Sequence, residues 1–383
     1  MSAAILGFLP LAVWLYLLLG RSGFWQMRER DDEAALPQPI SAENGRWPSV
    51  VAVVPARNEA DVIQKSIGSL LAQDYPGDFR VILVDDQSED GTASLLRALN
   101  FEKLTILTGA ARPAGWTGKL WAMHQGVARA DEFAPDFLLF TDADIAHAPE
   151  NLTRLVARAE DGNKVLVSLM ARLSCANPAE YFLIPAFVFF FDMLFPFGAV
   201  NDPKNRLAAA AGGCMLARRS ALIVAGGIEA IRHNIIDDCA LARLMKAQGP
   251  IWLGLSDRAV SLRPYAGLEE IRRMVSRSAY AQLGYSVLQL AGTLLGLLLV
   301  YIAPVAMALF GHGLPQMAGW AAWIIMALMF QPILRFYRLS PFWGLLLPLI
   351  GAVYAGFTLD SAIQHWQGKG GMWKGRAQAG TKI

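Results

Sequence analysis

The sequence predicts an α/β domain with a mostly parallel sheet, with membrane helices on both sides of it along the chain. Three observations support this fold class. Between about residues 48 and 265, short β-branched runs alternate with amphipathic segments, a pattern typical of parallel strands joined by helices. Long apolar blocks lie near both ends of the chain. In addition, 54% of the 383 residues are hydrophobic and 17% are charged, which indicates a membrane protein with a soluble part.

The N-terminal segment, residues 1–20, is expected to be a membrane anchor. Its residues are apolar over about the length that crosses a bilayer, and they lack the basic start and the cleavage site of a signal peptide. Arg21, Arg28 and Arg30 follow directly. By the positive-inside rule, the chain after the anchor is therefore expected to lie in the cytoplasm.

The middle of the chain is expected to begin with buried strands at 49–56 and 80–86, separated by an amphipathic helix at 59–73. A second helix, 90–99, begins at Asp90. This order indicates parallel strands joined by right-handed crossovers. Later strands are expected at 104–107, 137–141 and 165–170.

The apolar run 181–200 is expected to lie in the plane of the membrane interface. Asp192 interrupts it, together with proline and glycine residues. A crossing here would also separate the motifs on its two sides into different compartments. An interfacial helix accounts for both facts.

C-terminal membrane helices are expected between residues 283 and 363, followed by a basic tail at 364–383. Both the tail and the basic stretch 335–338 favour the cytoplasm, and one span between them cannot satisfy both. The number and orientation of the spans therefore stay open. The apolar blocks themselves are about 286–310, 314–334 and 341–363.

Acidic side chains follow several of the predicted strands. Asp142 and Asp144 come directly after an apolar strand, where charge is costly unless it is neutralised. A turn or a helix cap is the structural alternative for each of them. Because ligands bind at the carboxyl ends of parallel strands, the joint placement favours a site for a cation and a polar ligand. The other residues at these ends are Arg57, Glu59, Asp85 and Asp86.

Several classes of site are excluded. The sequence contains neither the glycine fingerprint of dinucleotide sites nor a P-loop, so a metal is expected to hold any phosphates. Asp142 and Asp144 offer the hard oxygen ligands that Mg²⁺ or Mn²⁺ requires. Three widely spaced cysteines form no disulfide framework, and a net charge of +2 gives no reason to expect nucleic acid as a partner.

Five motifs carry a resemblance to a known family. In chain order they are VVPARNEADVIQKSIGSLLAQDYP, VILVDDQSEDGT, GWTGKLWAMHQG, FTDADI and DDCALARLMKAQG. They resemble the motifs of family 2 glycosyltransferases, which implies the GT-A fold, a Rossmann-like mostly parallel sheet, over roughly residues 48–280. The stretch GWTGKLWA, the membrane segments and the closing WKGR are most similar to the hopanoid-biosynthesis-associated members.

The resemblance also implies roles for individual residues. Asp142 and Asp144 would form the metal-binding pair, with Mg²⁺ or Mn²⁺. The catalytic base falls on Asp238, and Asp237 stands where the family usually has a glutamate. A helix start stabilised by negative charge is the structural alternative for these two residues. The donor is expected to be bound by Pro55, Arg57, Glu59, Asp85, Asp86, Lys119 and Asp142.

Three further residues are candidates with clear alternatives. Trp116 lies between small residues that would leave its ring accessible for stacking on a sugar or base. Arg273 and Arg277 precede the C-terminal spans and are expected to contact donor phosphate or anionic lipid headgroups. Basic residues beside a membrane segment are also ordinary topology signals.

The expected function is therefore that of a membrane-bound inverting glycosyltransferase. It would move a single sugar from a nucleotide-sugar donor to a lipid acceptor at the cytoplasmic face of a bacterial inner membrane. The acceptor implied by the resemblance is a hopanoid, with polyprenyl phosphate as the alternative. The chain lacks the Q-x-x-R-W motif of processive members, so polymerisation is not expected. A catalytically silent domain that binds nucleotide-sugar is the rival hypothesis.

Overall fold

The computed structural model describes residues 2–31, 46–373 and 376–377. The chain forms two compact units. The sheet unit comes from the segments Glu29–Ser174, Ala199–Pro264 and Met372–Ile383, and the helical unit from Met1–Arg28, Cys175–Gly198 and Tyr265–Gly371. The domain limits expected from the sequence, 48–280, stay a prediction.

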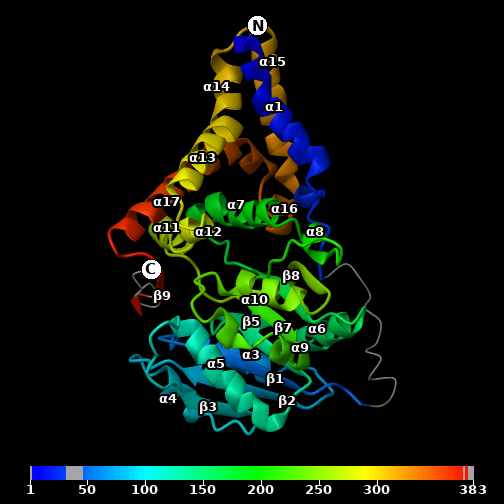
Figure 1. The fold of residues 1–383 in the computed structure, drawn as a ribbon, viewed down its shortest axis with the longest axis vertical. Coiled ribbons are helices and arrows are strands. Elements are labelled where there is room, and N and C mark those ends of the chain that lie inside the picture. Colours follow the sequence, from blue (N-terminus) through cyan, green and yellow to red (C-terminus); the bar gives the residue numbers. More distant parts are fainter. Residues whose placement is uncertain (1, 32–45, 374–375, 378–383) are drawn as a thin grey trace. The chain divides into compact units, whose positions relative to one another are not determined.

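The sheet unit is built on a mixed sheet of eight strands, in the order β3-β2-β1-β4-β7-β6-β8-β5 among the described residues (Figure 1). β3, β2, β1 and β4 are parallel neighbours. β7 lies antiparallel between β4 and β6, β8 runs parallel to β6, and β5 is antiparallel to β8. The strands are β1 Val50–Ala56, β2 Phe79–Asp85, β3 Leu104–Thr108, β4 Phe137–Thr141, β5 Ile145–His147, β6 Leu166–Arg172, β7 Cys214–Arg218 and β8 Ile251–Ser261.

The strands expected from the sequence are present, within a few residues of the expected ends. Three others were not expected: β5, β7 and β8. β5 has only three residues. Alanine and glycine residues directly precede β7, so the sequence does not indicate where β7 begins. Together they make the second half of the sheet partly antiparallel.

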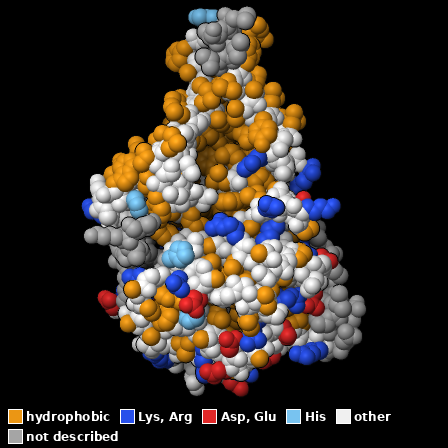
Figure 2. Space-filling model, in the orientation of Figure 1, with side chains coloured by type: hydrophobic (Ala, Val, Ile, Leu, Met, Phe, Trp, Pro, Cys, Tyr) orange, Lys and Arg blue, Asp and Glu red, His pale blue; other side chains and the backbone are white. Residues whose placement is uncertain are grey.

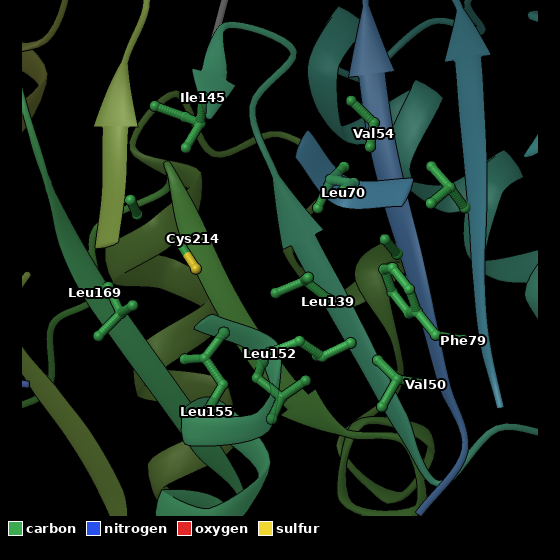
Figure 3. Packing of buried hydrophobic residues seen from close by; sticks show 14 of the residues in the cluster. Val50, Val54, Leu70, Phe79, Leu139, Ile145, Leu152, Leu155, Leu169 and Cys214 are labelled. Atoms are coloured by element: carbon green, nitrogen blue, oxygen red, sulfur yellow. The ribbon is translucent and has the colours of Figure 1, made fainter. Parts of the chain in front are cut away.

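Helices cover the sheet and complete its core. β1 is buried along its whole length, as expected for a central parallel strand. In Figure 3, Leu139 and Leu169 of the strands lie near Leu70 of α3 and Leu152 of α6, and all four belong to one hydrophobic cluster. The helices of this unit are α3 Ile63–Leu71, α4 Thr92–Arg97, α5 Gly118–Ala130, α6 Asn151–Glu160, α9 Arg219–Val224 and α10 Asp237–Lys246.

The helical unit contains three apolar stretches long enough to cross a membrane: Val287–Phe310, Gly313–Phe336 and Pro341–Trp366. They match the three expected blocks closely. Figure 2 shows hydrophobic side chains over much of the visible surface of this unit. The anchor helix, α1 Ser2–Gly20, has described side chains only from Phe8, and over that part it is a shorter apolar helix. Its role as an anchor stays a prediction.

The stretches are made of successive helices. They are α13 Val287–Leu297, α14 Ala303–Phe310, α15 Gly313–Met329, α16 Gln331–Phe336 and α17 Leu347–Trp366. The expected basic tail, 364–383, begins within α17. Its residues 374–375 and 378–383 lie outside the described part of the chain.

The apolar run 181–200 forms most of α7, Pro178–Leu194. Asn177 caps this helix and exchanges hydrogen bonds with Glu180, which is fully buried. The helix packs against α16 and α17. Its placement in the membrane interface stays a prediction.

An ion pair joins α11, Leu268–Ser276, to α17. Arg272 pairs with Asp360, and the hydroxyl of Ser276 donates to the same carboxylate at 2.7 Å. Asp360 would be costly in an apolar stretch, and these contacts neutralise it.

Replacing Gly126 by alanine is expected to lower the melting temperature of the detergent-solubilised protein. A Cβ atom here would lie 2.4 Å from Val53 Cγ1 and 3.1 Å from Val84 Cγ2, so α5 would have to move off the sheet. Such overpacking costs about 1–3 kcal/mol. Gly68→Ala in α3 is the matched control, because a Cβ there meets nothing within 4 Å. Equal melting temperatures for G126A and wild type would contradict this close packing.

Candidate active site

The candidate site lies at the carboxyl ends of β1, β2 and β4. These strands are parallel neighbours, so their ends meet at one edge of the sheet. The backbone N–H of Asp86 donates to the carbonyl of Ala56, and that of Gly109 to the carbonyl of Asp85, both at 2.8 Å. The predicted polar residues at the ends of β1 and β2 are therefore brought together.

Arg57 holds the loops after β1 and β2 together. Its guanidinium donates to the backbone carbonyls of Asp86 and Gln87, at 2.5 and 2.9 Å. The backbone N–H of Asn58 donates to the hydroxyl of Ser88. Pro55 is buried within β1, and Asp86 is only 1% exposed. These contacts give the edge of the site a fixed shape, while the donor-binding roles stay predictions.

Glu59 is paired with a residue that sequence reasoning missed. Arg263, just after β8, forms ion pairs with Glu59 and with Asp61. Its Nε also lies 3.9 Å from Asp144 Oδ2. The backbone N–H of Leu262 donates to the carbonyl of Asp144 at 2.7 Å, which fixes this arrangement. No sequence signal identified Arg263, because the strand before it was not recognised.

Lys119 lies between two acidic side chains from different elements. Its Nζ is 2.8 Å from Asp142 Oδ1, after β4, and 3.1 Å from Asp237 Oδ2, at the start of α10. The hydroxyl of Thr117 caps α5 and accepts from the N–H of Leu120. Burial alone would lower the pKa of Lys119, but the carboxylates of Asp142 and Asp237 outweigh it and raise that pKa. Lys119 is therefore charged at neutral pH.

Asp238, the predicted base, lies at the start of α10. Backbone N–H groups of Gly212 and Cys239 donate to its two oxygens, at 3.0 and 2.7 Å. Burial and then the charge of Asp237 raise the pKa of Asp238 to about 6, against the opposing effect of Lys119. A carboxylate with this pKa can accept a proton near neutral pH.

The aromatic residues do not lie as expected. The expectation that small neighbours leave the Trp116 ring accessible is wrong, because this residue is only 9% exposed. Its ring packs against Trp121 and His124, with centroids 5.2 and 4.8 Å away. Trp121 and His124 lie on the first two turns of α5, and their rings pack against the ring of Trp116. A donor-binding role for Trp116 stays a prediction.

His147, close to the acidic pair in sequence, belongs to the frame of the site. Its ring nitrogens are hydrogen bonded to Thr141 and Asn151, both at 2.9 Å. Burial lowers the pKa of His147 to about 4. It is therefore engaged in holding the end of β4 against α6.

Arg273 and Arg277 lie in the helical unit, whereas the other predicted site residues lie in the sheet unit. Both are exposed, and Arg273 Nε pairs with Glu269 Oε1 at 2.9 Å. Contact of either arginine with phosphate stays a prediction.

The acidic pair has the right chemistry for a divalent cation. The side chains of Asp142 and Asp144 are 36% and 26% exposed, so both reach solvent. Within the described ranges, no group of three or more His, Cys, Asp or Glu side chains is placed to hold a metal. Mg²⁺ needs only one or two carboxylates when substrate phosphates supply further ligands. The residues present therefore fit a cation that is bound together with a phosphorylated ligand.

Comparison with known proteins finds a family match over part of the chain. Residues 51–225 match the family model of glycosyl transferase family 2. An N-acetylglucosaminyltransferase of Mesorhizobium japonicum is 28% identical over 46% of this chain and 41% of its own length. A beta-monoglucosyldiacylglycerol synthase of Synechocystis sp. is 33% identical over 41% of this chain and 32% of its own length. The chain thus spans less than half the length of these relatives.

A solved structure supports the fold. A mannosyltransferase from Pyrobaculum calidifontis, in complex with GDP-Man and Mn²⁺, matches with a TM-score of 0.53. The match covers 94% of this chain and 100% of the other at 18% identity. The expected α/β, GT-A-like sheet is therefore confirmed, together with a C-terminal stretch of three apolar helices.

The raised pKa of Asp238 predicts how stability changes with pH. A carboxyl that binds its proton more tightly in the folded state stabilises the fold below its unfolded pKa of about 3.9. This stabilisation is lost as pH rises through about 6. Asp238→Asn cannot ionise, so its melting temperature relative to wild type should rise between pH 4 and pH 7.

Thermal unfolding in detergent across this pH range measures the effect. Asp78→Asn is the control, because the Asp78 side chain is 60% exposed. A constant difference between D238N and wild type over the whole range would contradict the raised pKa.

Proposed function

We propose, from the match of residues 51–225 to the model of glycosyl transferase family 2, that the protein transfers a single sugar from a nucleotide-sugar donor to a lipid acceptor. One observation carries the proposal. Lys119 joins Asp142, at the end of β4, to Asp237, which precedes Asp238 at the start of α10. A cation-binding carboxylate and a base candidate thus lie on either side of one ammonium group.

The donor is proposed to lie over the carboxyl ends of β1, β2 and β4. Ligands of open α/β sheets bind at such ends. The loop fixed by Arg57 lies there, with Asp85 and Asp86 at the end of β2. Pro55 and Glu59 complete the proposed nucleotide pocket. Lys119 would face the diphosphate.

Mg²⁺ or Mn²⁺ is proposed to be held by Asp142 and Asp144. The Pyrobaculum calidifontis mannosyltransferase was solved with Mn²⁺, and the exposed carboxylates fit such an ion. When bound, the ion offsets the negative charge on the departing nucleotide diphosphate.

Asp238 is proposed to act as the general base. The acceptor hydroxyl attacks the anomeric carbon from the face opposite the leaving group, and its proton passes to the Asp238 carboxylate. A bond forms between the acceptor oxygen and the sugar carbon while the bond to the diphosphate breaks. A single displacement of this kind inverts the configuration. The N–H groups of Gly212 and Cys239 hold the carboxylate in place.

The acceptor is proposed to be a lipid at the cytoplasmic face of the bacterial inner membrane. One relative is named as a beta-monoglucosyldiacylglycerol synthase, and another, from Yersinia enterocolitica, as an undecaprenyl-phosphate 4-deoxy-4-formamido-L-arabinose transferase. Three apolar helices in this chain support contact with a membrane. The sequence resemblance favours a hopanoid, and polyprenyl phosphate is the alternative.

Release of nucleotide diphosphate by the full-length protein in lipid tests the proposal. The assay uses a panel of UDP- and GDP-sugars, with hopanoid or polyprenyl-phosphate acceptor, and with or without EDTA. Acceptor-dependent release that EDTA abolishes is the expected result, and the productive pair identifies both substrates. Donor binding without release for any pair would favour a silent binding domain.

Asp238→Asn is expected to lower turnover by roughly 10²–10⁴-fold, the usual contribution of a general base. Donor affinity should change little, because the substitution keeps the shape of the side chain. Turnover is followed by nucleotide diphosphate release and donor affinity by calorimetry, with Asp78→Asn as the control. Equal losses of turnover and donor affinity would contradict the role of Asp238.

A further inference from the structure

Lys119 occupies a position that its donor-binding role alone does not explain. Its ammonium hydrogen bonds to Asp142 at 2.8 Å and forms an ion pair with Asp237 at 3.1 Å. The contact with Asp237 is an ion pair without hydrogen-bond geometry, because Asp237 Oδ2 is a buried atom with no hydrogen-bond partner within the described residues. The positive charge of Lys119 is thus what offsets the charge of this oxygen.

The backbone at Gly212 lies close to this ammonium. A Cβ atom on Gly212 would lie 3.3 Å from Lys119 Nζ and 3.5 Å from Asp238 Oδ2. The same glycine donates its N–H to Asp238. The side chain of Lys119 is 17% exposed, so the group is largely shielded from solvent. Electrostatic forces between such shielded groups are screened less by salt than those at the surface.

Lys119 offsets part of the negative charge of the site. The site contains four carboxylates, on Asp142, Asp144, Asp237 and Asp238. Within the part of the chain that the structure describes, Asp142 and Asp237 both form ion pairs with Lys119, whereas Asp144 lies 3.9 Å from Arg263. Without Lys119, the carboxylates of Asp142 and Asp237 would face each other with no positive charge between them. Such a cluster would attract a divalent cation by itself.

We infer that Lys119 is a positioning residue that keeps a divalent cation from binding Asp142 until the nucleotide-sugar arrives. The inference rests on the proposed function, because it concerns the cation of that reaction. An ion entering at Asp142 must compete with the ammonium for the same carboxylate and is repelled by it. The donor diphosphate adds negative charge, which offsets the positive charges of both the ion and the Lys119 ammonium. Cation and donor therefore bind cooperatively, and each strengthens the binding of the other.

Mn²⁺ binding to the full-length protein in detergent tests this inference without any turnover. Free Mn²⁺ is measured by electron paramagnetic resonance, with no nucleotide and then with UDP or GDP. Wild type should bind Mn²⁺ at least about tenfold more tightly with nucleotide than without it. Lys119→Met should bind Mn²⁺ at least about tenfold more tightly than wild type when no nucleotide is present, and should lose most of the cooperativity.

Three further variants make the test specific. Lys119→Arg keeps the positive charge and should retain the weak Mn²⁺ binding of wild type in the absence of nucleotide. Lys119→Met combined with Asp142→Asn should lose the gain in Mn²⁺ affinity, because the freed carboxylate is absent. Lys119→Gln removes the charge but keeps a hydrogen-bond donor for Asp142. It replaces Lys119→Met in the binding test if that variant has a reduced melting temperature.

Two results would overturn the inference. One is equal Mn²⁺ affinity in K119M and wild type without nucleotide. The other is the absence of Mn²⁺ binding in every variant and condition, which would remove Asp142 as a ligand. Failure of the proposed function has a different signature, since it abolishes acceptor-dependent diphosphate release in the wild type whatever the Mn²⁺ affinity.

Discussion

The ion pairs of Lys119 with Asp142 and Asp237 are the interaction on which the site depends. They join the end of a central strand to the starts of two helices that are far apart in the sequence. Each partner is fixed by something else in the fold. Gly126 lets α5 approach β1 and β2 closely, and the backbone at Gly212 leaves space for the ammonium. The Asp237 side chain is only 16% exposed, and a carboxylate so shielded from water needs a nearby positive charge.

Much of the fold could be predicted because its first half is built from local patterns. β1, β2 and β4 are buried parallel strands and appear as continuous apolar runs in the sequence. β7 and β8 gave no such signal. β7 pairs with β4, more than 70 residues earlier in the chain, and such pairing leaves no periodic trace in either segment. β8 carries Asp257 and Arg258 within the strand, which interrupts its apolar pattern.

The site was predictable in its chemistry but only partly in its contacts. Carboxylates at strand ends can be recognised from their residue type. The structure brings Asp142 and Asp237 to the same ammonium group, that of Lys119. Arg263 was missed because its partners, Glu59 and Asp144, lie over 100 residues away in sequence. The expectation that the Trp116 ring is accessible was wrong for a related reason. The ring of His124 packs against it only once α5 has formed.

The hydrogen bonds of His147 have a consequence for how the protein responds to acidification. An ordinary imidazole gains a proton near pH 6.5, and a charged ring at this position would repel cations and lose an acceptor nitrogen. Burial lowers the pKa of His147 to about 4, so the joint between β4 and α6 does not change in mild acid. The scaffold and the base candidate thus respond to different ranges of acidity. Mild acidification would protonate Asp238 and leave this joint intact.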